Sequence, residues 1–512
     1  MILFCDFDGT LFRRGIEGDF EKNLEKVRLW RKRGNKFALT TGRGLGSILS
    51  AFPDLWQFVD YLICDNGALC YSHHEKLFEL SIDEKIEQRV VNFVRSLPGS
   101  DRFDFVYYRE DGEFEFPSSS DTKIRIWTVD LETMADVANK LRQELAGEKV
   151  IFFEGHTLIP YNSGSQPFLR DYHHGAIDVM ASDAGKQNAI YRVLRENPGE
   201  EIIAVGDGGN DMDMLSEFDG YIMSNASESL KNDFRESHIV DSVADLLEKR
   251  LIFDDINAKL NVNLVESKPH YYTDGATNST VFSIDNEYLV KISDERTVRE
   301  LVEFLTANTN PVFQSYLCSD EELKYACLGF IEGKHYKEDP LEAHAAAEQI
   351  ANIVKNYAVY DCEQYGFMND MKPTWYDFLL DEVEYAAKRI PDISQDAVRV
   401  ALEKTRGFTP EKRLLHGDFG THNFLVNNGI IRVIDPMPVV GDKLYDFYFA
   451  ILSNIGIFPE LGLDYIFSFF DEYDAEYKKA ILTIALYVRM SRAAVYDTKN
   501  LDKYIEMYTE KI

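Results

Sequence analysis

Residues 1–250 alternate short apolar runs with amphipathic helical segments, a pattern that leaves few folds open. Apolar runs at 2–5, 36–40, 61–64 and 201–205 have the length and composition of buried strands. Between the first two, residues 20–34 have helical periodicity and end on a glycine. This alternation predicts an α/β fold with a doubly wound parallel sheet, in which ligands bind beyond the carboxyl ends of the strands.

Polar residues follow the ends of these predicted strands. The first strand runs into residues 6–10, Asp-Phe-Asp-Gly-Thr, whose two carboxylates at i and i+2 leave the strand on the same side. The second runs into Thr-Gly-Arg at 41–43, and the strand at 201–205 runs into a glycine-rich acidic loop at 206–211 that suits a hard cation. Lys186 begins a predicted helix just upstream and could neutralise a phosphoryl group. The sequence therefore predicts an acidic, cation-binding site at this edge of the sheet.

The same motifs, in the same order, resemble the haloacid dehalogenase superfamily of phosphatases. The matching segments are DFDGT, TTGR, DNGAL, the Lys186 helix, VGDGGNDMDML and IMSNASESLK, spread over about 250 residues. DFDGT alone would be only an acidic turn, and the acidic loop alone could be a helix cap; the ordered set favours the phosphatase interpretation. The resemblance is strongest to the sugar-phosphate phosphatases that carry an inserted α/β cap.

This resemblance implies a role for each matching residue. Asp6 would attack phosphorus and form an aspartyl-phosphate, and Asp8 would protonate the leaving oxygen and later activate water. Thr41 and Lys186 would bind the phosphoryl oxygens. Mg²⁺ would be held by Asp6, Asp207 and the main-chain carbonyl of Asp8, with support from Asn210 and Asp211.

Residues 83–175 interrupt the sheet pattern and are predicted to be the cap, so that the phosphatase core comprises residues 1–82 and 176–250. The cap sequence predicts helices at 84–97 and 131–145 and strands at 123–130 and 149–155. In the resembled subgroup the cap contacts the part of the substrate that is not phosphate. Its polar side chains are interpreted as solvated or packing residues rather than as ligands; among them are Arg109, Lys123, Arg125 and Tyr161.

A second unit begins after a change of pattern around residues 250–268. Residues 271–293 predict two strands joined by a turn at Asp285-Asn286, with Lys291 inside the second strand between apolar neighbours. A loop of small residues at 274–279 precedes these strands. The following helix, at 296–305, offers Glu300 and Glu303 as partners for the lysine.

The most specific motif of the second half is HGDFGTHN at 416–423. It precedes the apolar segment FLVNNGIIRVIDP, which predicts a hairpin that turns at Asn428-Gly429 and ends at Asp435. Asp418, Asn423 and Asp435 would therefore converge at the ends of short strands. One carboxylate can orient a hydroxyl group, while the amide and the second carboxylate hold Mg²⁺ on ATP phosphates.

Residues 265–512 resemble the aminoglycoside phosphotransferase and choline kinase family, which has the bilobal α+β fold of protein kinases. The resemblance implies that Asp418 is the catalytic base, that Asn423 and Asp435 bind Mg²⁺, and that Lys291 binds ATP phosphates while paired with Glu300, or failing that with Glu303. It also implies a hinge at 330–333 and a supporting acid at Asp446. The loop at 274–279 departs from the family pattern, since it is not a GxGxxG. Gly275 is therefore interpreted in two ways, as a contact to ATP phosphate or simply as a turn residue. For Lys291 the alternative is a solvated strand lysine, and for the domain as a whole a decayed kinase.

Charge and composition limit the partners. The chain carries 87 acidic against 55 basic side chains, a net charge of -32, which would repel nucleic acid and anionic membranes. The six cysteines show no metal-binding spacing. The amino terminus has no basic leader, and the apolar stretches are too short to cross a bilayer, so we expect a cytoplasmic protein.

Taken together, the two halves predict a bifunctional enzyme that uses Mg²⁺ and ATP. The first half would hydrolyse a small-molecule phosphoester, and the second would phosphorylate a small-molecule hydroxyl acceptor, sugar-like or amino alcohol-like. A shared substrate would consume ATP in a futile cycle, so we expect the two activities to act on different positions of one metabolite, on successive metabolites, or under opposing regulation. Consecutive steps in the metabolism of a sugar or a similar hydroxylated small molecule are the leading hypothesis. Two alternatives are a nucleic-acid end-processing phosphatase-kinase, which the net charge disfavours, and a phosphatase with a regulatory, protein-modifying kinase-like module.

Overall fold

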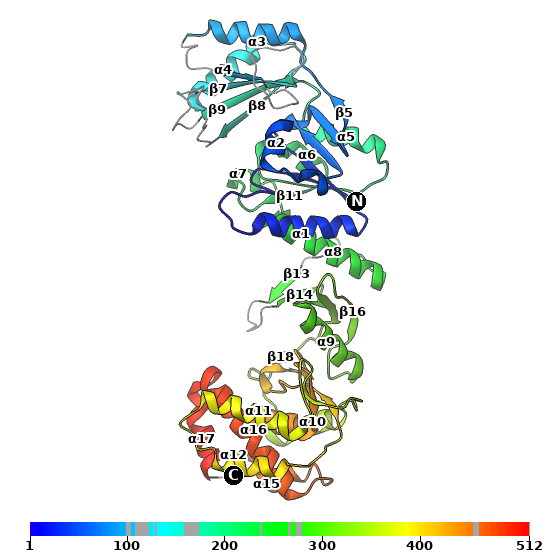
Figure 1. Ribbon diagram of the computed structural model, residues 1–512, viewed down its shortest axis with the longest axis vertical. Coiled ribbons are helices and arrows are strands. Elements are labelled where there is room, and N and C mark those ends of the chain that lie inside the picture. The colour runs from blue at the N-terminus through cyan, green and yellow to red at the C-terminus, as the bar shows by residue number, and fades with distance from the viewer. Residues whose placement is uncertain are drawn as a thin grey trace. The chain divides into compact units, whose positions relative to one another are not determined.

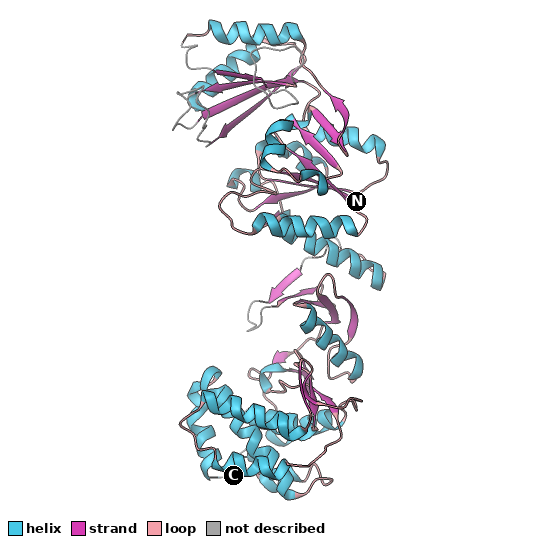
Figure 2. Ribbon diagram, in the orientation of Figure 1, coloured by secondary structure: helices cyan, strands magenta, loops and turns pink. Residues whose placement is uncertain are grey.

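The computed structural model describes residues 1–98, 104–107, 122–128, 131–157, 174–235, 238–264, 267, 269–272, 279–453 and 460–510. The chain divides into two compact units, Met1–Leu251 and Ile252–Ile512 (Figure 1). Each unit contains both helices and strands (Figure 2). The domain boundaries expected from the sequence, including those of the cap, stay a prediction.

An eight-stranded sheet forms the centre of the first unit, in the order β12-β11-β10-β1-β2-β3-β4-β5. The pairs from β12 to β3 are parallel, whereas β4 and β5 pair antiparallel at one edge. The strands are β1 (Ile2–Asp6), β2 (Lys36–Thr40), β3 (Tyr61–Cys64), β4 (Leu69–Ser72), β5 (Glu75–Glu79), β10 (Ile202–Gly206), β11 (Asp219–Met223) and β12 (Ile239–Val240). The predicted parallel sheet is confirmed, and the antiparallel edge is an addition to it.

The central strands are apolar over most of their length because the sheet is covered on both faces. All five residues of β1 and of β10 are buried, as expected for parallel strands between helical layers. On α1 the buried side chains recur at helical spacing, with Val27 and Trp30 among them. The helices of this part are α1 (Asp19–Lys32), α2 (Leu45–Ala51), α5 (Lys186–Glu196), α6 (Met212–Glu217), α7 (Glu228–Lys231) and α8 (Val243–Leu260), which crosses the boundary between the units.

A second, four-stranded antiparallel sheet lies in the chain between β5 and α5, in the order β6-β7-β9-β8. Its strands are β6 (Asp104–Tyr107), β7 (Lys123–Thr128), β8 (Val150–Thr157) and β9 (His174–Ala181). Alternate residues of β7, Ile124 and Ile126, join the apolar core that this sheet forms with α3 (Glu84–Ser96) and α4 (Leu131–Glu144). Because side chains alternate across a strand, Lys123 and Arg125 lie on the opposite face of the sheet. The inserted α/β cap is thus confirmed.

The second unit begins with an antiparallel sheet of order β13-β14-β15-β17-β16. Its strands are β13 (Pro269–Tyr272), β14 (Thr280–Ile284), β15 (Tyr288–Ile292), β16 (Tyr316–Asp320) and β17 (Tyr325–Gly329), and α9 (Glu295–Ala307) follows β15. The predicted turn at Asp285-Asn286 is present with both residues at positive φ, as a two-residue hairpin loop requires.

Smaller strands carry the predicted motifs of the second unit. The hairpin turning at Asn428-Gly429 is formed by β22 (Phe424–Asn427) and β23 (Ile430–Val433), with β18 (Lys334–His335) on its other edge. The strands of a four-stranded sheet, of order β20-β19-β24-β21, flank this hairpin in the chain. Its strands are β19 (Tyr365–Phe367), β20 (Asp370–Lys372), β21 (Arg413–Leu415) and β24 (Val439–Gly441).

Helices build the rest of the second unit around one large apolar core. Most residues of α16 are buried, which makes it the central helix of this core. The helices are α10 (Ala343–Lys355), α11 (Trp375–Arg389), α12 (Asp396–Thr405), α13 (Lys443–Ser453), α15 (Leu463–Phe467), α16 (Ala475–Tyr496) and α17 (Leu501–Glu510). The kinase-like α+β fold is confirmed. Of the helices that the structure describes, none has an apolar stretch long enough to span a bilayer.

Candidate active sites

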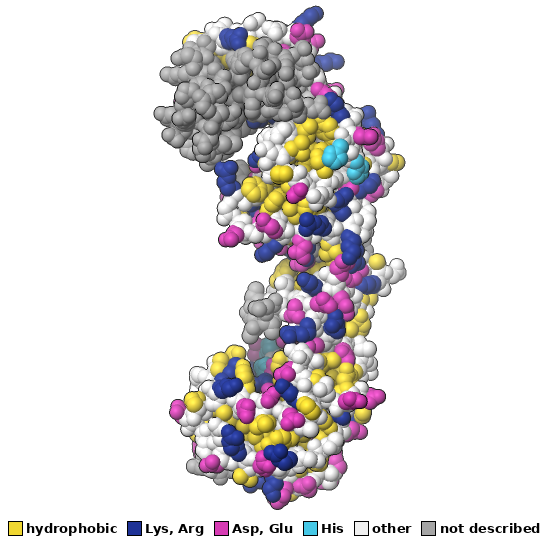
Figure 3. Space-filling view, viewed as in Figure 1, with side chains coloured by type: hydrophobic (Ala, Val, Ile, Leu, Met, Phe, Trp, Pro, Cys, Tyr) yellow, Lys and Arg dark blue, Asp and Glu magenta, His cyan; other side chains and the backbone are white. Residues whose placement is uncertain are grey.

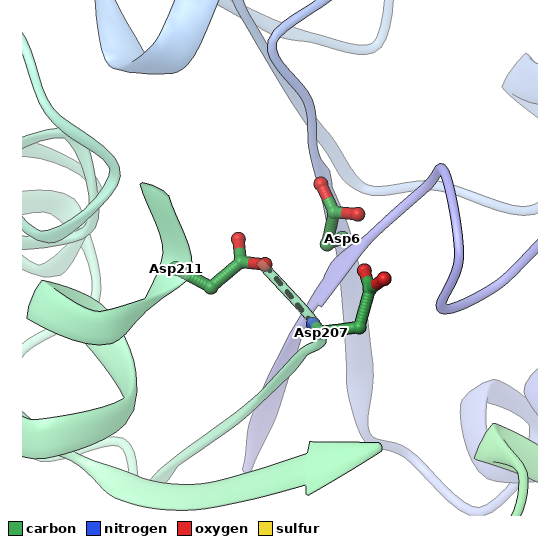
Figure 4. Close-up of side chains that lie close together, drawn as sticks. All are labelled: Asp6, Asp207 and Asp211. Carbon is green, nitrogen blue, oxygen red and sulfur yellow. Dashed lines mark hydrogen bonds between the residues drawn. The ribbon is translucent and has the colours of Figure 1, made fainter. Parts of the chain in front are cut away.

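Three carboxylates gather at the carboxyl ends of two neighbouring strands of the first unit. Asp6 is the last residue of β1, Asp207 directly follows β10, and Asp211 ends the short helical turn after it. One oxygen from each lies within 4.8 Å of the others (Figure 4). Asp211 is held by main-chain N–H groups, since those of Asp207 and Gly208 donate to its Oδ2 at 3.1 and 2.9 Å. Hard cations prefer such an oxygen cluster.

Lys186 binds two of these carboxylates. It is the first residue of α5, its side chain is wholly buried, and its Nζ lies 2.5 Å from Asp6 Oδ1 and 2.6 Å from Asp211 Oδ1. Breaking such a buried pair leaves an uncompensated charge, which is strongly destabilising. One ammonium group therefore fixes the positions of two carboxylates that come from different strands.

Burial, together with the charges of the cluster, raises several pKa values. Burial raises the pKa of Asp6 well above its usual range, despite the attraction of Lys186. Burial and then the Asp211 charge raise the pKa of Asp207 to about 6. For Lys186 burial alone would lower the pKa, but the two carboxylates outweigh it and raise the value. Three carboxylates face one ammonium group, so the cluster retains negative charge that a divalent cation would neutralise.

The chain packs tightly against Asp207. Gly9 has a φ of 84°, and a Cβ at this position would lie 2.1 Å from Asp207 Oδ2, so the turn after β1 needs a glycine. The hydroxyl of Thr10 donates to Asp207 Oδ1 at 3.0 Å. These contacts explain why Gly9 and Thr10 follow Asp8 in the DFDGT motif.

Asp8, unlike Asp6, reaches solvent. Its side chain is 52% exposed, and Arg43 holds it in a bidentate ion pair, with Nε and Nη2 donating at 2.6 and 2.5 Å. Thr41 is buried beside this arginine, and its Oγ1 accepts a hydrogen bond from the Arg43 N–H. The structure thus places the two aspartates of the motif in different surroundings, one buried against Lys186 and one exposed on Arg43.

Two of the four cap residues named from the sequence form ion pairs with buried carboxylates. Lys123 pairs with Asp65, and Arg125 pairs with Asp178 on the neighbouring strand β9. Arg109 and Tyr161 lie outside the described residues.

In the second unit Asp418 is surrounded by donors. Arg492 Nη1 donates to its Oδ1 at 2.7 Å, and His422 Nε2 lies 3.0 Å from its Oδ2. Asn423 Nδ2 donates to the Asp418 carbonyl at 2.9 Å and to Oδ2 at 3.2 Å. Burial would raise the pKa of Asp418, but the His422 hydrogen bond and then the Arg492 charge lower it well below its usual range. Asp418 is therefore held as a carboxylate.

Lys291 lies in β15 and forms an ion pair with Asp435, which follows β23 and has a φ of 58°. The Lys291–Glu300 pair expected from the sequence is not formed in this structure. Glu300 is half-buried on α9, and burial raises its pKa, while Glu303 accepts a hydrogen bond from the Tyr360 hydroxyl. Gly275 lies outside the described residues, so its phosphate contact stays a prediction.

Main-chain contacts hold the loop that carries Asp418. Asp446, wholly buried on α13, accepts hydrogen bonds from the N–H groups of His416 and Gly417 and from the Tyr357 hydroxyl. Gly417 has a φ of 78°, and a Cβ there would lie 1.9 Å from the Met437 carbonyl oxygen. His416 is also wholly buried, and burial lowers its pKa to about 4. Asp446 thus contacts the loop that carries Asp418, and the family resemblance implied a supporting acid at this position.

Sequence reasoning missed two cations of these sites. The sequence marks Arg43 only as the last residue of the Thr-Gly-Arg segment, and its place beside Thr41 brings it to Asp8. Arg492 lies 74 residues beyond Asp418, near the carboxyl end of the largely buried helix α16, and no motif or spacing marks it. Burying an arginine without a partner is costly. The only indication that the sequence gives is therefore that an arginine on such a helix needs a buried partner.

Comparisons with protein families agree with this division of the chain. Residues 3–245 match the model of the haloacid dehalogenase-like hydrolases, and residues 271–481 match that of the phosphotransferase enzyme family. A search of the curated proteins found no match.

Among solved structures, the chain is similar to a Streptococcus mutans UA159 protein, with 17% identity, 49% of this chain and 98% of the other covered, and a TM-score of 0.39. A sugar phosphatase of haloacid dehalogenase subclass IIB has 18% identity over 49% and 98% of the two chains, with a TM-score of 0.38. A haloacid dehalogenase-like hydrolase from Bacteroides thetaiotaomicron has 20% identity over 49% and 98%, with a TM-score of 0.39. By its family matches, the chain combines a region similar to the haloacid dehalogenase-like hydrolases with a region similar to the phosphotransferase enzyme family, which indicates a phosphatase activity and a kinase activity.

Proposed function

We propose that the first unit hydrolyses small-molecule phosphomonoesters through an aspartyl-phosphate on Asp6. The observation that carries this proposal is the single ammonium group of Lys186 between Asp6 and Asp211, with Asp207 beside them. A phosphoryl group that approached Asp6 would meet this ammonium group, and Lys186 would stabilise the charge that develops on the phosphoryl oxygens. Thr41 would provide a hydroxyl donor to the same oxygens.

Asp8 would act as the general acid and base of this reaction. Its exposed carboxylate can exchange protons with solvent and with a leaving group, and Arg43 fixes its direction. Asp6, Asp207 and the carbonyl of Asp8, supported by Asn210 and Asp211, would hold Mg²⁺. When bound, the cation would supply positive charge that lowers the repulsion between an anionic phosphoester and the carboxylates.

The test of this mechanism is chemical trapping on the full chain with p-nitrophenyl phosphate as the probe. Borohydride reduces an acyl-phosphate, so a quenched turnover mixture should contain homoserine at position 6, identified by the mass of the peptide. The Asp8→Asn variant should accumulate more of this product, because its acyl-phosphate lacks the base for hydrolysis. Hydrolysis that continues in Asp6→Asn would refute the proposed nucleophile.

The second unit is proposed to transfer the terminal phosphoryl group of ATP to the hydroxyl group of a small molecule. Asp418, held as a carboxylate by its contacts with Arg492 and His422, would orient the acceptor hydroxyl. Asn423 and Asp435 would bind Mg²⁺, and Lys291 would bind ATP phosphates, with Glu300 as its partner when ATP is bound. The ion pair of Lys291 with Asp435 supports this arrangement, because it brings the phosphate-binding cation to a proposed metal ligand.

The substrates are proposed to belong to consecutive steps of one small-molecule pathway, since a shared substrate would consume ATP in a cycle. Joining the two enzymes would raise the local concentration of the intermediate.

Figure 3 shows acidic and basic side chains interspersed over the described residues that it draws, without a basic band on that face. A panel of sugar phosphates, sugars and amino alcohols tests the link: unrelated preferences of the two units would contradict it.

A further inference from the structure

The turn after β3 contacts three of the loops that form the proposed phosphatase site. Asp65 and Asn66 both have positive φ, 48° and 45°, which is uncommon for residues other than glycine. The N–H groups of Asp65 and Asn66 donate to the carbonyls of Arg43 and Thr41 at 2.9 and 3.0 Å. Backbone in this region is retained only where its surroundings impose it.

The same turn reaches the loops of Lys186 and Asp207. The Asn66 carbonyl accepts a hydrogen bond from the N–H of Gly185, directly before Lys186, at 2.8 Å. Its side-chain Oδ1 accepts one from Asn210 Nδ2 at 3.1 Å. The Asp65–Gly67 turn is thus a shared support for the phosphoryl-binding threonine, for the catalytic lysine and for the acidic loop.

A residue of the cap binds this support. Lys123, the first residue of β7, has a wholly buried side chain, and its Nζ lies 2.6 Å from Asp65 Oδ1, which is itself buried. The same Nζ donates to the carbonyl of Gly42 at 2.7 Å, between Thr41 and Arg43. The hydroxyl of Thr122 donates to Asp65 Oδ2 at 2.8 Å. One cap ammonium group therefore joins the Asp65 turn to the Thr41–Arg43 loop.

We infer that Lys123 and Asp65 are positioning residues for phosphoryl transfer, through which the docked cap fixes the Thr41–Arg43 loop. The inference rests on the proposed roles of Thr41 and of Arg43, the partner of Asp8. Without Lys123, Asp65 would be a buried carboxylate without this ammonium group, and the Gly42 carbonyl would lose a donor. Such a buried charge favours relaxation of the turn toward solvent. A displacement of about 1 Å in a positioning group can lower a rate about 100-fold.

The cap also provides a matched control. Arg125 lies two residues further along β7, on the same face of the sheet, and pairs with the buried Asp178 through two bonds of 2.5 Å. This pair joins two strands of the cap, β7 and β9, rather than the cap and the turn after β3. Its removal should cost stability as the removal of the Lys123–Asp65 pair does, but it should leave the Thr41–Arg43 loop in place.

The experiment compares full-length Lys123→Met, Asp65→Asn, the double variant Lys123→Met/Asp65→Asn and the control Arg125→Met/Asp178→Asn. Hydrolysis of p-nitrophenyl phosphate with Mg²⁺ gives kcat and KM, and hydrogen exchange gives the protection of the amides at 43, 65 and 66. Each single variant should lower kcat about tenfold or more and speed exchange at these amides. The double variant should be no slower than the worse single variant, because the two side chains act as one pair. The control should lose thermal stability with kcat and these amides unchanged.

Thr122→Val covers the case in which the charged variants do not fold. It removes only the hydroxyl donor of Asp65 and should lower kcat a few-fold with the same local increase in exchange. The inference is overturned if the effects of Lys123→Met and Asp65→Asn multiply, if the control slows turnover equally, or if Thr122→Val leaves both readouts unchanged. Continued hydrolysis by Asp6→Asn would instead overturn the proposed phosphatase mechanism. In that case the hydrogen exchange of the amides at 43, 65 and 66 would still show whether Lys123 and Asp65 fix the Thr41–Arg43 loop.

Discussion

Replacing Lys186 by methionine should destabilise the first unit far more than the loss of an ordinary lysine. The side chain is wholly buried and binds Asp6 and Asp211 at 2.5 and 2.6 Å. Methionine keeps much of the volume and removes the charge, so two buried carboxylates lose their common partner. Breaking a buried pair in this way costs about 3–5 kcal/mol. In a buffer that chelates divalent cations, the free energy needed to open the first unit should be lower in Lys186→Met than in the wild type by an amount in this range.

Magnesium should restore part of this loss. With the ammonium group removed, the Asp6, Asp207 and Asp211 cluster carries more negative charge, so Mg²⁺ should stabilise the variant more than it stabilises the wild type. Native-state hydrogen exchange of β1 and β10 measures the opening of this unit separately from the second, which matters because a chain of two units need not unfold in one step.

Lys26→Met is the control for this prediction. Lys26 forms an ion pair of 2.6 Å with Glu248 at the surface, where both side chains are partly exposed. Such pairs contribute about 0–1 kcal/mol. Equal losses in Lys186→Met and Lys26→Met, or a smaller effect of Mg²⁺ on Lys186→Met than on the wild type, would refute the account of Lys186.

Two further predictions concern the second unit. Arg492→Met should lower ATP turnover about tenfold or more, because the Asp418 carboxylate loses a donor that positions it; Arg489→Met, one turn earlier on α16, is the control, and equal turnover in the two variants would contradict this role. Burial gives His416 a pKa of about 4 in the fold, against the opposing attraction of Asp418 and Asp435, whereas the value in an unfolded chain is about 6.5. The folded state therefore binds fewer protons between these values, so stability is present above pH 6.5 and falls by up to about 3 kcal/mol as the pH drops toward 4. Hydrogen exchange of β21 across this range should show that His416→Gln removes most of that dependence, and an unchanged slope would contradict the assignment.

The predicted strands and strand-end motifs came from local signals, and these are the parts that the structure bears out. An apolar run identifies a buried strand, and the polar residue after it lies at the edge of the sheet, so Asp6, Asp207 and Lys186 could be brought together from spacing and topology. The turn at Asn428-Gly429 is equally local, because its residues tolerate positive φ. The antiparallel strands β4 and β5 were missed because they are short and follow a tight turn.

The contacts that complete the sites depend on tertiary packing instead. Arg492 approaches Asp418, and Lys123 approaches Asp65, across long stretches of chain. In a single sequence a lysine or arginine is expected at the surface, and nothing local tells a buried partner from a solvated one. Tertiary packing also decides that Lys291 pairs with Asp435 rather than with Glu300. The three side chains come from different elements, and the sequence allows either pair.

The most direct test of two independent enzymes in one chain compares full-length wild type, Asp6→Asn and Asp418→Asn on the same panel of phosphorylated and hydroxylated metabolites. Phosphate release and ATP consumption are followed separately. We expect Asp6→Asn to abolish phosphate release from phosphoesters and to leave ATP consumption intact, and Asp418→Asn to do the reverse. Loss of both activities in either variant, or ATP consumption that persists in Asp418→Asn, would contradict the account.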